Sequence, residues 1–232
     1  MKTIGLIGGT SYASTLDYYR IINEEINKRL GGLSSAQMLI YSVDYQTAVY
    51  EPKQQNDWHT IGNTFAEIAL KLQRGGADMI LIGANMPHKI ADYITQIPLV
   101  HIGEVTGEHI AAKGYKKVGL IGSREVMEGD YLKKHYYPYR DGEVIIPDEA
   151  DKEYINDVIF NEMCKGEFKE ESRKEYLEII NKLSERGAEA VVMGCTEIPI
   201  LLKEVSSPIP LLDTMTLHCL KAVDLSLKCH FD

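Results

Sequence analysis

The sequence predicts an α/β protein built from two similar, doubly wound domains, each with a parallel β-sheet. Three observations support this fold class: short apolar runs alternate with longer amphipathic segments, Gly or Pro bounds most of the runs, and sequence patterns recur about half a chain apart. Alternating β and α segments imply parallel sheets whose faces are covered by helices. The 232 residues suffice for one large domain or two small ones with a buried core.

The apolar runs are the expected strands. They are rich in Ile, Leu and Val, and they are too short to be helices with a core-facing side. They occupy residues 4–7, 36–43, 79–83, 118–122, 144–147 and 190–194. The segments between them carry apolar residues three or four positions apart, as amphipathic helices do. The expected helices occupy residues 15–30, 58–74, 104–113, 151–164 and 169–186.

An internal repeat indicates how the chain divides. KTIGLIGG (2–9) resembles KKVGLIGS (116–123), and GADMILIGANMPH (76–88) resembles GAEAVVMGCTEIP (187–199), at offsets of about 114 and about 111 residues. Turns after strands often look alike because they need glycine, but two pairs at nearly one offset favour duplication. We expect a first domain of residues 1–100 with about 208–232, and a second domain of residues 101–207.

The strand ends locate a candidate site. In open parallel sheets, ligands bind beyond the carboxyl ends of the strands. If a pseudo-twofold axis relates the two domains, the turns at residues 8–11, 83–88, 122–124 and 194–197 converge on one shared cleft. The active site is therefore expected between the domains, with Ala84 and Cys195 on opposite walls.

Composition argues against several other classes. Hydrophobic residues make up 44% and charged residues 25% of the chain, and the net charge of −9 does not suit a nucleic-acid partner. No apolar run approaches the roughly 20 residues of a membrane span. The N-terminal MKTIGLIGG enters a strand-like run without leader features, so we expect a cytoplasmic protein. The four cysteines show neither CxxC nor zinc-ligand spacing, and we expect free thiols and no metal site.

The GCTEIP stretch carries a candidate nucleophile. Cys195 follows a buried-type strand and precedes an expected helix at 197–204, and a helix N-terminus lowers a thiol pKa from about 8.5. The structural alternative is a small buried cysteine at a tight turn. Thr196 either binds a substrate carboxylate or caps the helix. Glu197 either orients the thiol or only favours the first helical turn.

Other turns add polar groups. In GANMPH, Asn85 offers an amide, Met86 follows it, and His88 is a further candidate, although a lone His is more often structural. In LIGGTSYAST, Gly8 and Gly9 allow backbone N–H groups to approach an anion, beside the hydroxyls of Thr10 and Ser11. An ordinary capped turn explains that stretch almost as well.

The remaining candidates come from the second half of the chain and its end. Ser123 stands at the turn of IGSRE, and Lys165 in CKGEF either meets a substrate carboxylate or complements a helix dipole. Asp213, expected as a helix cap, and His218 are expected to be structural.

Several of these motifs are similar to those of one family. VVMGCTEIPIL resembles the C-terminal cysteine signature of the aspartate/glutamate racemase superfamily, and GGTSYASTLDYYRIIN, SSAQMLIYSVDY and PLLDTMTLH resemble its aspartate racemase branch. The resemblance spans essentially the whole chain. It implies two pseudosymmetric α/β domains, usually a homodimer, and amino-acid racemisation without pyridoxal phosphate or another cofactor.

The resemblance also implies roles for residues. Two cysteines flank the substrate α-carbon, one removing the α-proton and the other delivering a proton to the opposite face, while donors stabilise the carboxylate. Cys195 corresponds to one catalytic thiol. The expected substrate contacts are Thr10, Asn85, Met86, Ser123, Lys165, Thr196 and Glu197, with Gly9 and His88 as further candidates.

The departure lies at the second thiol. The family pattern has Cys or Thr before Asn-Thr, and this chain has Gly83-Ala84-Asn85-Met86, so Ala84 occupies the position of the missing thiol. Four explanations compete: a variant with impaired turnover, a substitute donor such as water or His88, one-thiol chemistry as in arylmalonate decarboxylases, or a non-catalytic binding pocket. We expect a racemase-family enzyme for aspartate or glutamate, with a one-cysteine decarboxylase and a silent binding protein as alternatives.

Overall fold

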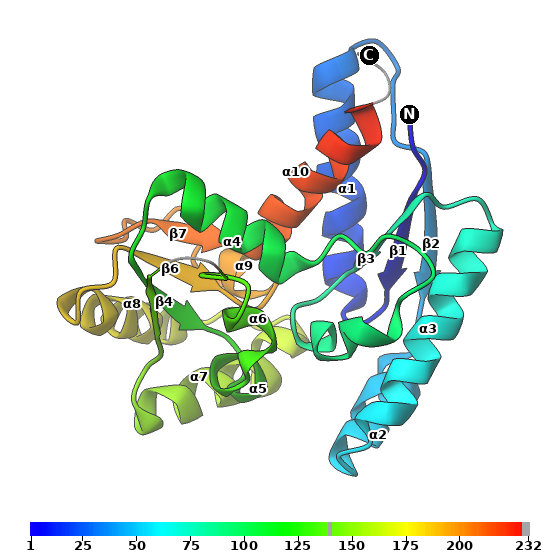
Figure 1. Cartoon of the computed structure of the whole chain (residues 1–232). Helices are drawn as coiled ribbons and strands as arrows, with labels where there is room; N and C mark the ends of the chain where they lie inside the picture. The colour runs from blue at the N-terminus through cyan, green and yellow to red at the C-terminus, as the bar shows by residue number, and fades with distance from the viewer. Residues whose placement is uncertain (139–140, 229–232) are drawn as a thin grey trace. The chain divides into compact units, whose positions relative to one another are not determined.

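A computed structural model describes residues 1–138 and 141–228 (Figure 1). The chain forms two compact units, one of Met1–Ile102 with the C-terminal segment from Met215, and one of Gly103–Thr214. The strands are β1 (Ile4–Gly8), β2 (Met38–Ser42), β3 (Met79–Ile82), β4 (Lys117–Ile121), β5 (Glu143–Ile145), β6 (Ala190–Met193) and β7 (Leu211–Asp213). The α-helices are α1 (Tyr12–Leu30), α2 (Glu51–Gln54), α3 (Trp58–Arg74), α4 (Ile102–Lys113), α5 (Arg124–Glu128), α6 (Asp130–Lys133), α7 (Glu149–Asn161), α8 (Glu170–Glu185), α9 (Ile198–Leu201) and α10 (Thr214–Leu227). Three tighter or wider helical segments are η1 (Gln46–Tyr50), η2 (Met86–Tyr93) and η3 (Met163–Lys165).

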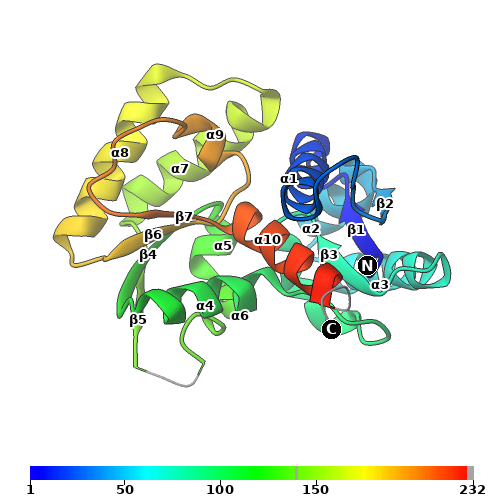
Figure 2. The same cartoon turned by 90° about the horizontal axis from the view of Figure 1, so that it is seen from above.

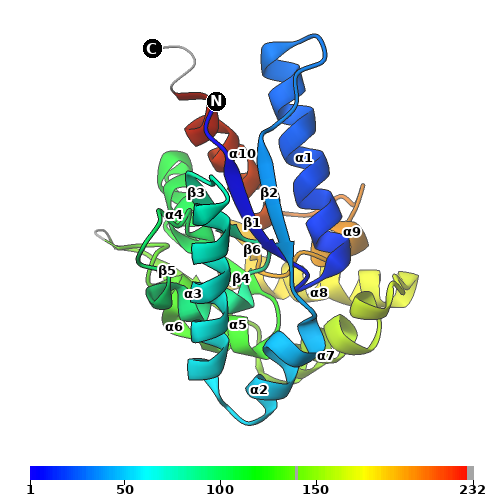
Figure 3. The ribbon, with the colours of Figure 1, turned by 90° about the vertical axis from the view of Figure 1, so that its right-hand side faces the viewer.

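The first unit has a parallel sheet in the order β2-β1-β3. Leu6 of β1 pairs with Ile40 on one side and Leu81 on the other. Helix α3 covers one face of the sheet and α1 covers the other (Figure 3). Helix α10 joins this unit because Ser226 exchanges hydrogen bonds with the backbone of Lys2.

The second unit has a parallel sheet in the order β5-β4-β6-β7. Helix α4 lies on one face of this sheet, and α7 and α8 lie on the other (Figure 2). The side that faces α7 and α8 is filled by a continuous apolar core that includes Ile155, Tyr176 and Val191. The two sheets share the strand order in which the unit's first strand lies between its second and third.

The internal repeat is visible in the backbone hydrogen bonds. The N–H of Gly83 donates to Ile7 at 2.9 Å, and the N–H of Gly194 donates to Ile121 at 2.7 Å. Both glycines therefore leave the sheet at equivalent points, immediately after the unit's third strand. The predicted fold class, two α/β domains with parallel sheets, is confirmed.

A second equivalence between the units involves the strand that follows each unit's third strand. Ile80 donates to Pro98 at 2.8 Å, and Val191 donates to Pro210 at 2.9 Å. The segment IPLV (97–100) thus repeats as IPLL (209–212). In the second unit this segment forms the regular strand β7, and in the first it makes only a single bridge between Ile80 and Leu99.

Some element bounds differ from the expected ones. Strand β7 pairs with β6, so residues 208–214 belong to the second unit, whereas we expected them in the first. The helix expected at 197–204 is only the single turn α9, because it closes at Leu202. Within residues 1–138 and 141–228, no helix is both long and apolar enough to span a membrane.

Candidate functional site

In the second unit, the turns after β4 and β6 lie against each other. These strands are neighbours, and Gly122 and Gly194 follow their last residues. A Cβ at Gly122 would meet the Gly194 carbonyl oxygen at 3.1 Å, and one at Gly194 would meet the Val126 side chain at 2.7 Å. Glycine at both positions lets the backbones approach, which brings the Ser123 turn beside the Cys195 turn.

Cys195 belongs to a short hydrogen-bonded group that centres on the Glu197 carboxylate. Its Sγ donates to Oε2 of Glu197 at 3.1 Å, and Oγ1 of Thr196 donates to the same carboxylate oxygen at 2.8 Å. Thr196 and Glu197 are buried, and Cys195 is partly exposed. Glu197 makes no side-chain cap to α9. Of the two sequence interpretations of Glu197, the geometry supports the one in which it orients the thiol.

The expected low thiol pKa is wrong. Burial, and then the Glu197 carboxylate, raise the pKa of Cys195 well above its ordinary value. The helix after it has only four residues, so its dipole gives little compensation. Cys195 is therefore a neutral thiol at pH 7 whose proton is held by a carboxylate.

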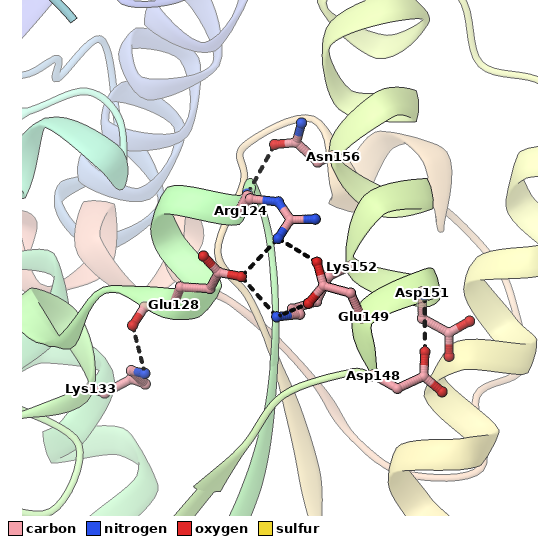
Figure 4. A network of polar contacts seen from close by, with 8 residues as sticks. All are labelled: Arg124, Glu128, Lys133, Asp148, Glu149, Asp151, Lys152 and Asn156. Atoms are coloured by element: carbon pink, nitrogen blue, oxygen red, sulfur yellow. Dashed lines mark hydrogen bonds and ion pairs between the residues drawn. The ribbon is translucent and has the colours of Figure 1, made fainter. Parts of the chain in front are cut away.

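The turn that carries Ser123 adjoins a network of ion pairs that its neighbour Arg124 forms. The N–H of Arg124 donates to Oδ1 of Asn156 at 2.9 Å, which fixes the start of α5 against α7 (Figure 4). The Arg124 guanidinium lies 3.0 Å from Glu128 and 2.6 Å from Glu149, and Lys152 lies 2.7 Å from both carboxylates. Arg124 is therefore already paired, while Ser123 is buried and does not cap α5 with its side chain.

Lys165, a candidate from the sequence, and Thr214, at the start of α10, differ in exposure. Lys165 ends η3, before Gly166 in the left-handed conformation, and its exposed ammonium makes no ion pair with any described residue. Thr214 is buried and donates to the Met193 carbonyl at 2.9 Å, which ties the start of α10 to the end of β6. Lys165 alone of these two is available to a ligand. No group of three or more metal-binding side chains occurs among the described residues.

In the first unit, the turns after β1 and β3 are joined by hydroxyl groups. Thr10 and Ser14 donate to the Gly83 carbonyl at 3.5 and 3.3 Å. The Gly9 N–H donates to Oγ1 of Thr15 at 2.8 Å. This N–H is therefore not available to an anion, contrary to our expectation. Gly9 has φ +82° and its Cα lies against the backbone of Val43, which explains the glycine without a ligand.

The turn after β3 holds Ala84 at a defined place. Nδ1 of His88 donates to the Ala84 carbonyl at 2.8 Å, and Nε2 accepts from the N–H of Ile102 at 3.2 Å. His88 is buried, and burial together with neighbouring histidines lowers its pKa well below its ordinary value. Both nitrogens of His88 are thus engaged, which argues against this residue as the substitute proton donor. Ala84 and Met86 are partly exposed, and Asn85 between them is buried.

A second buried histidine stabilises the same unit. Nδ1 of His218 lies 2.8 Å from the Tyr18 hydroxyl, and Nε2 lies 2.7 Å from the Val100 carbonyl. The carbonyl can only accept, so Nε2 carries the hydrogen and Nδ1 accepts from Tyr18. Burial lowers the pKa of His218 to about 4. This residue is structural, as expected.

The lowered pKa of His218 makes the stability of the folded chain depend on pH. Because the unfolded chain binds a proton at His218 near pH 6.5 and the folded chain only near 4, stability is full above pH 6.5 and falls as the pH drops toward 4. The loss amounts to about 3 kcal/mol. We expect His218→Gln to reduce the difference in unfolding free energy between pH 7 and pH 4, measured with urea. His59→Gln, at an exposed histidine, should leave that difference unchanged; an equal reduction in both variants would contradict the assignment.

The chain has two similar α/β units, and one of them has a cysteine turn with a carboxylate and hydroxyls at the carboxyl end of its sheet. This combination is typical of the two-domain α/β racemases. The family model described as Asp/Glu/Hydantoin racemase matches residues 7–222. The chain therefore belongs to the Asp/Glu/hydantoin racemase family, and the resemblance seen in its motifs is confirmed.

Individual relatives support this assignment. A Yersinia pestis protein assigned as an Asp/Glu racemase has 37% identity and a TM-score of 0.92, covering 98% of this chain and 100% of its own. PH1733, an aspartate racemase homologue from Pyrococcus horikoshii OT3, has 30% identity and a TM-score of 0.82 over the same shares. The broad specificity amino-acid racemase RacX of Bacillus subtilis (strain 168) is 21% identical over 217 residues, which are 91% of this chain and 92% of that protein.

Proposed function

We propose that the protein is a cofactor-independent amino-acid racemase-family isomerase in which Cys195 exchanges the α-proton of aspartate or glutamate. The observation that carries this proposal is the Cys195–Glu197 pair, a thiol 3.1 Å from a buried carboxylate at the end of a parallel strand. Family membership supports the reaction type.

The pair suits proton transfer in both directions. Glu197 takes the thiol proton, and the thiolate then removes the substrate α-proton: the C–H bond breaks, an S–H bond forms, and the electron pair stays on the α-carbon, delocalised into the carboxylate. Reversal of these steps returns a proton to the same face. Since the resting thiol has a raised pKa, the carboxylate beside it is needed to accept the proton at neutral pH.

The substrate carboxylates need donors. In the second unit, Ser123, Thr196 and the exposed Lys165 ammonium are proposed to bind them, because an α-carbanion forms only where its carboxylate is stabilised. In the first unit, Thr10, Asn85 and Met86 are proposed to complete the contacts. The proposed reaction uses only these side chains and the substrate.

Ala84 sets the expected outcome of the reaction. It stands at the turn where the family pattern has a second thiol, and a methyl group moves no proton. Because His88 has both nitrogens engaged, it does not compensate. We propose that α-proton exchange is faster than inversion, so that the activity is largely one-sided.

Isotope exchange tests the proposal. We expect the protein, incubated in D₂O with L- and D-aspartate and L- and D-glutamate, to incorporate α-deuterium measurably faster than it inverts the configuration. Deuteration is followed by proton NMR and inversion by chiral chromatography. Because RacX is named for broad specificity, the other amino acids form a second panel.

Each outcome decides between functions. Exchange and inversion at equal rates would show that a second donor replaces the Ala84 position. Release of CO₂ from an arylmalonate would favour the decarboxylase. Binding of amino acids with neither exchange nor inversion would contradict the proposal and favour a binding protein.

A further inference from the structure

The side chain of Ser123 does not cap the helix that follows it. Ser123 stands at the N-cap position of α5, where a serine hydroxyl usually accepts from an N–H of the first helical turn. It makes no such bond, and no hydrogen bond of this hydroxyl to any other residue in 1–138 or 141–228 occurs. The residue is nevertheless buried, and buried polar groups are usually paired. An unpaired hydroxyl at this place suits a ligand.

Other acceptors take the place of the serine cap. The N–H of Arg124, the first residue of α5, donates to Oδ1 of Asn156 at 2.9 Å (Figure 4). The N–H groups of Val126 and Met127 donate to the backbone carbonyl of Ser123 at 2.9 and 3.0 Å. The N–H groups at a helix start need such partners, and a side-chain cap is one way to supply them. Asn156 is the acceptor that comes from outside the turn, from 32 positions away on α7.

Helix α7 gives Asn156 a firm support. Ile155, the residue before it, is fully buried in the apolar core, and its carbonyl accepts from the Tyr176 hydroxyl at 3.1 Å. At the first turn of the helix, the Asp151 carboxylate pairs with Lys182 of α8 at 2.8 Å. A side chain on an element that is packed and bonded in this way holds its partner at a defined place.

Helix α5 is also held from the side of the cysteine turn. Val126 is buried, and its side chain lies so close to Gly122 and Gly194 that a Cβ on these glycines would be 3.0 and 2.7 Å from it. Gly194 directly precedes Cys195. The start of α5 is therefore fixed by Val126 against the cysteine turn and by Asn156 against α7, which sets the place of the serine turn beside the reactive thiol.

We propose that Asn156 is a positioning residue for substrate binding: it binds the Arg124 N–H and so leaves the Ser123 hydroxyl to donate to a substrate carboxylate. This inference rests on the proposed function, in which Ser123 contacts the substrate. Asn156 acts through Ser123 and does not itself touch the substrate. Without the amide oxygen, the Arg124 N–H loses its acceptor and the serine hydroxyl turns toward the first turn of α5, where serine ordinarily caps. The substrate then loses one hydrogen bond.

The ion pairs of Arg124 are the other connection between α5 and α7. The Arg124 guanidinium pairs with Glu149 of α7 at 2.6 Å, and both side chains are exposed. Exposed ion pairs contribute little to stability, because water screens the charges and two long side chains lose their freedom. We therefore assign the positioning to Asn156. Arg124→Ala separates the two connections, since it removes the ion pairs and keeps the N–H that Asn156 binds.

Proton exchange in variants tests the proposal. We expect Asn156→Leu, which lacks the acceptor at nearly the same size, to lower kcat/KM for α-deuteration of aspartate or glutamate in D₂O by about tenfold, the effect of one hydrogen bond to a charged group. Asn156→Asp, which keeps the acceptor oxygen, should retain most of the parent value. Arg124→Ala should stay close to the parent. So should Asn161→Leu, the matched control, because Asn161 is exposed on the same helix and binds Asp157 within it.

A double variant separates positioning from a general structural role. If Asn156 acts through Ser123, Asn156→Leu should cause little further loss of kcat/KM in a Ser123→Ala protein. Losses that multiply, or an Arg124→Ala protein as impaired as Asn156→Leu, would overturn the inference. Circular dichroism and urea unfolding establish that each variant is folded under the assay conditions, and Asn156→Ala repeats the comparison if Asn156→Leu does not fold.

The failure of this inference differs from the failure of the proposed function. A parent protein that exchanges no α-proton would refute the proposed function and, with it, the role of Asn156. A parent protein that exchanges the α-proton, together with an Asn156→Leu variant of equal kcat/KM, would refute the role of Asn156 alone.

Discussion

Replacing Ala84 by cysteine is expected to raise the rate of amino-acid inversion by about 10²-fold or more, because a positioned general acid or base contributes 10²–10⁴-fold. The proposed chemistry lacks a proton donor for one face of the α-carbon. A thiol at residue 84 supplies the group that the family pattern has at this turn. Exchange of the α-proton, which Cys195 already performs in the proposal, should change much less than inversion.

The local structure can accept the added sulfur. Ala84 does not have a left-handed backbone conformation, and it is partly exposed. Its carbonyl is held by His88 at 2.8 Å, so the turn has a defined position before the substitution. Inversion and exchange are measured in D₂O at several substrate concentrations, to separate kcat from KM.

The matched control is Ala84→Ser, because serine has nearly the same size as cysteine but carries a hydroxyl that hardly ionises at neutral pH. We expect little gain in inversion from this variant. If Ala84→Cys folds and binds aspartate or glutamate but gains nothing over Ala84→Ser, residue 84 is not in the path of the second proton.

The sequence predicted the fold well because the signals are local. Runs such as IGLI and AVVMG are buried on both faces of a parallel sheet, which makes them continuously apolar. The repeat then showed that the pattern occurs twice. The boundary near residue 208 was wrong because membership of β7 depends on its pairing with β6, a contact between residues about 20 positions apart that no local pattern reveals.

The site could be predicted only in part. The motif GCTEIP located Cys195, but the sign of its pKa shift depends on desolvation and on the carboxylate of Glu197, and the short length of α9 was not evident. Thr15 and Asn156 were missed altogether. Thr15, in α1, accepts the hydrogen bond of the Gly9 N–H. Asn156, in α7, accepts the hydrogen bond of the Arg124 N–H from 32 positions away in the sequence, and so fixes the turn that carries Ser123.

Replacing Cys195 by serine is expected to abolish measurable α-proton exchange, a loss of about 10⁴-fold, which is the upper end of what a positioned general base contributes. The reason is the acidity of the group beside Glu197: a hydroxyl is several pKa units weaker as an acid than a thiol, and the buried carboxylate that holds the thiol proton at 3.1 Å would not remove a proton from serine to a useful extent. The change is nearly isosteric, so the hydrogen bond to Glu197 and the fold should both persist. Exchange in D₂O is the measurement.

Cys164→Ser is the matched control, because Cys164 is an exposed, free thiol of the same unit that influences Cys195 and Glu197 only electrostatically and transfers no proton in the proposed chemistry. That variant should exchange at the parent rate.

Glu197→Gln separates the acidity of the thiol from proton acceptance by the carboxylate. Loss of the carboxylate charge lowers the pKa of Cys195, so alkylation of this thiol should become faster at pH 7. Exchange of the α-proton should become slower, because no carboxylate accepts the thiol proton. A Cys195→Ser protein that still exchanges at full rate would remove this thiol from the reaction. A Glu197→Gln protein in which exchange rises together with alkylation would show that the carboxylate only restrains the thiol.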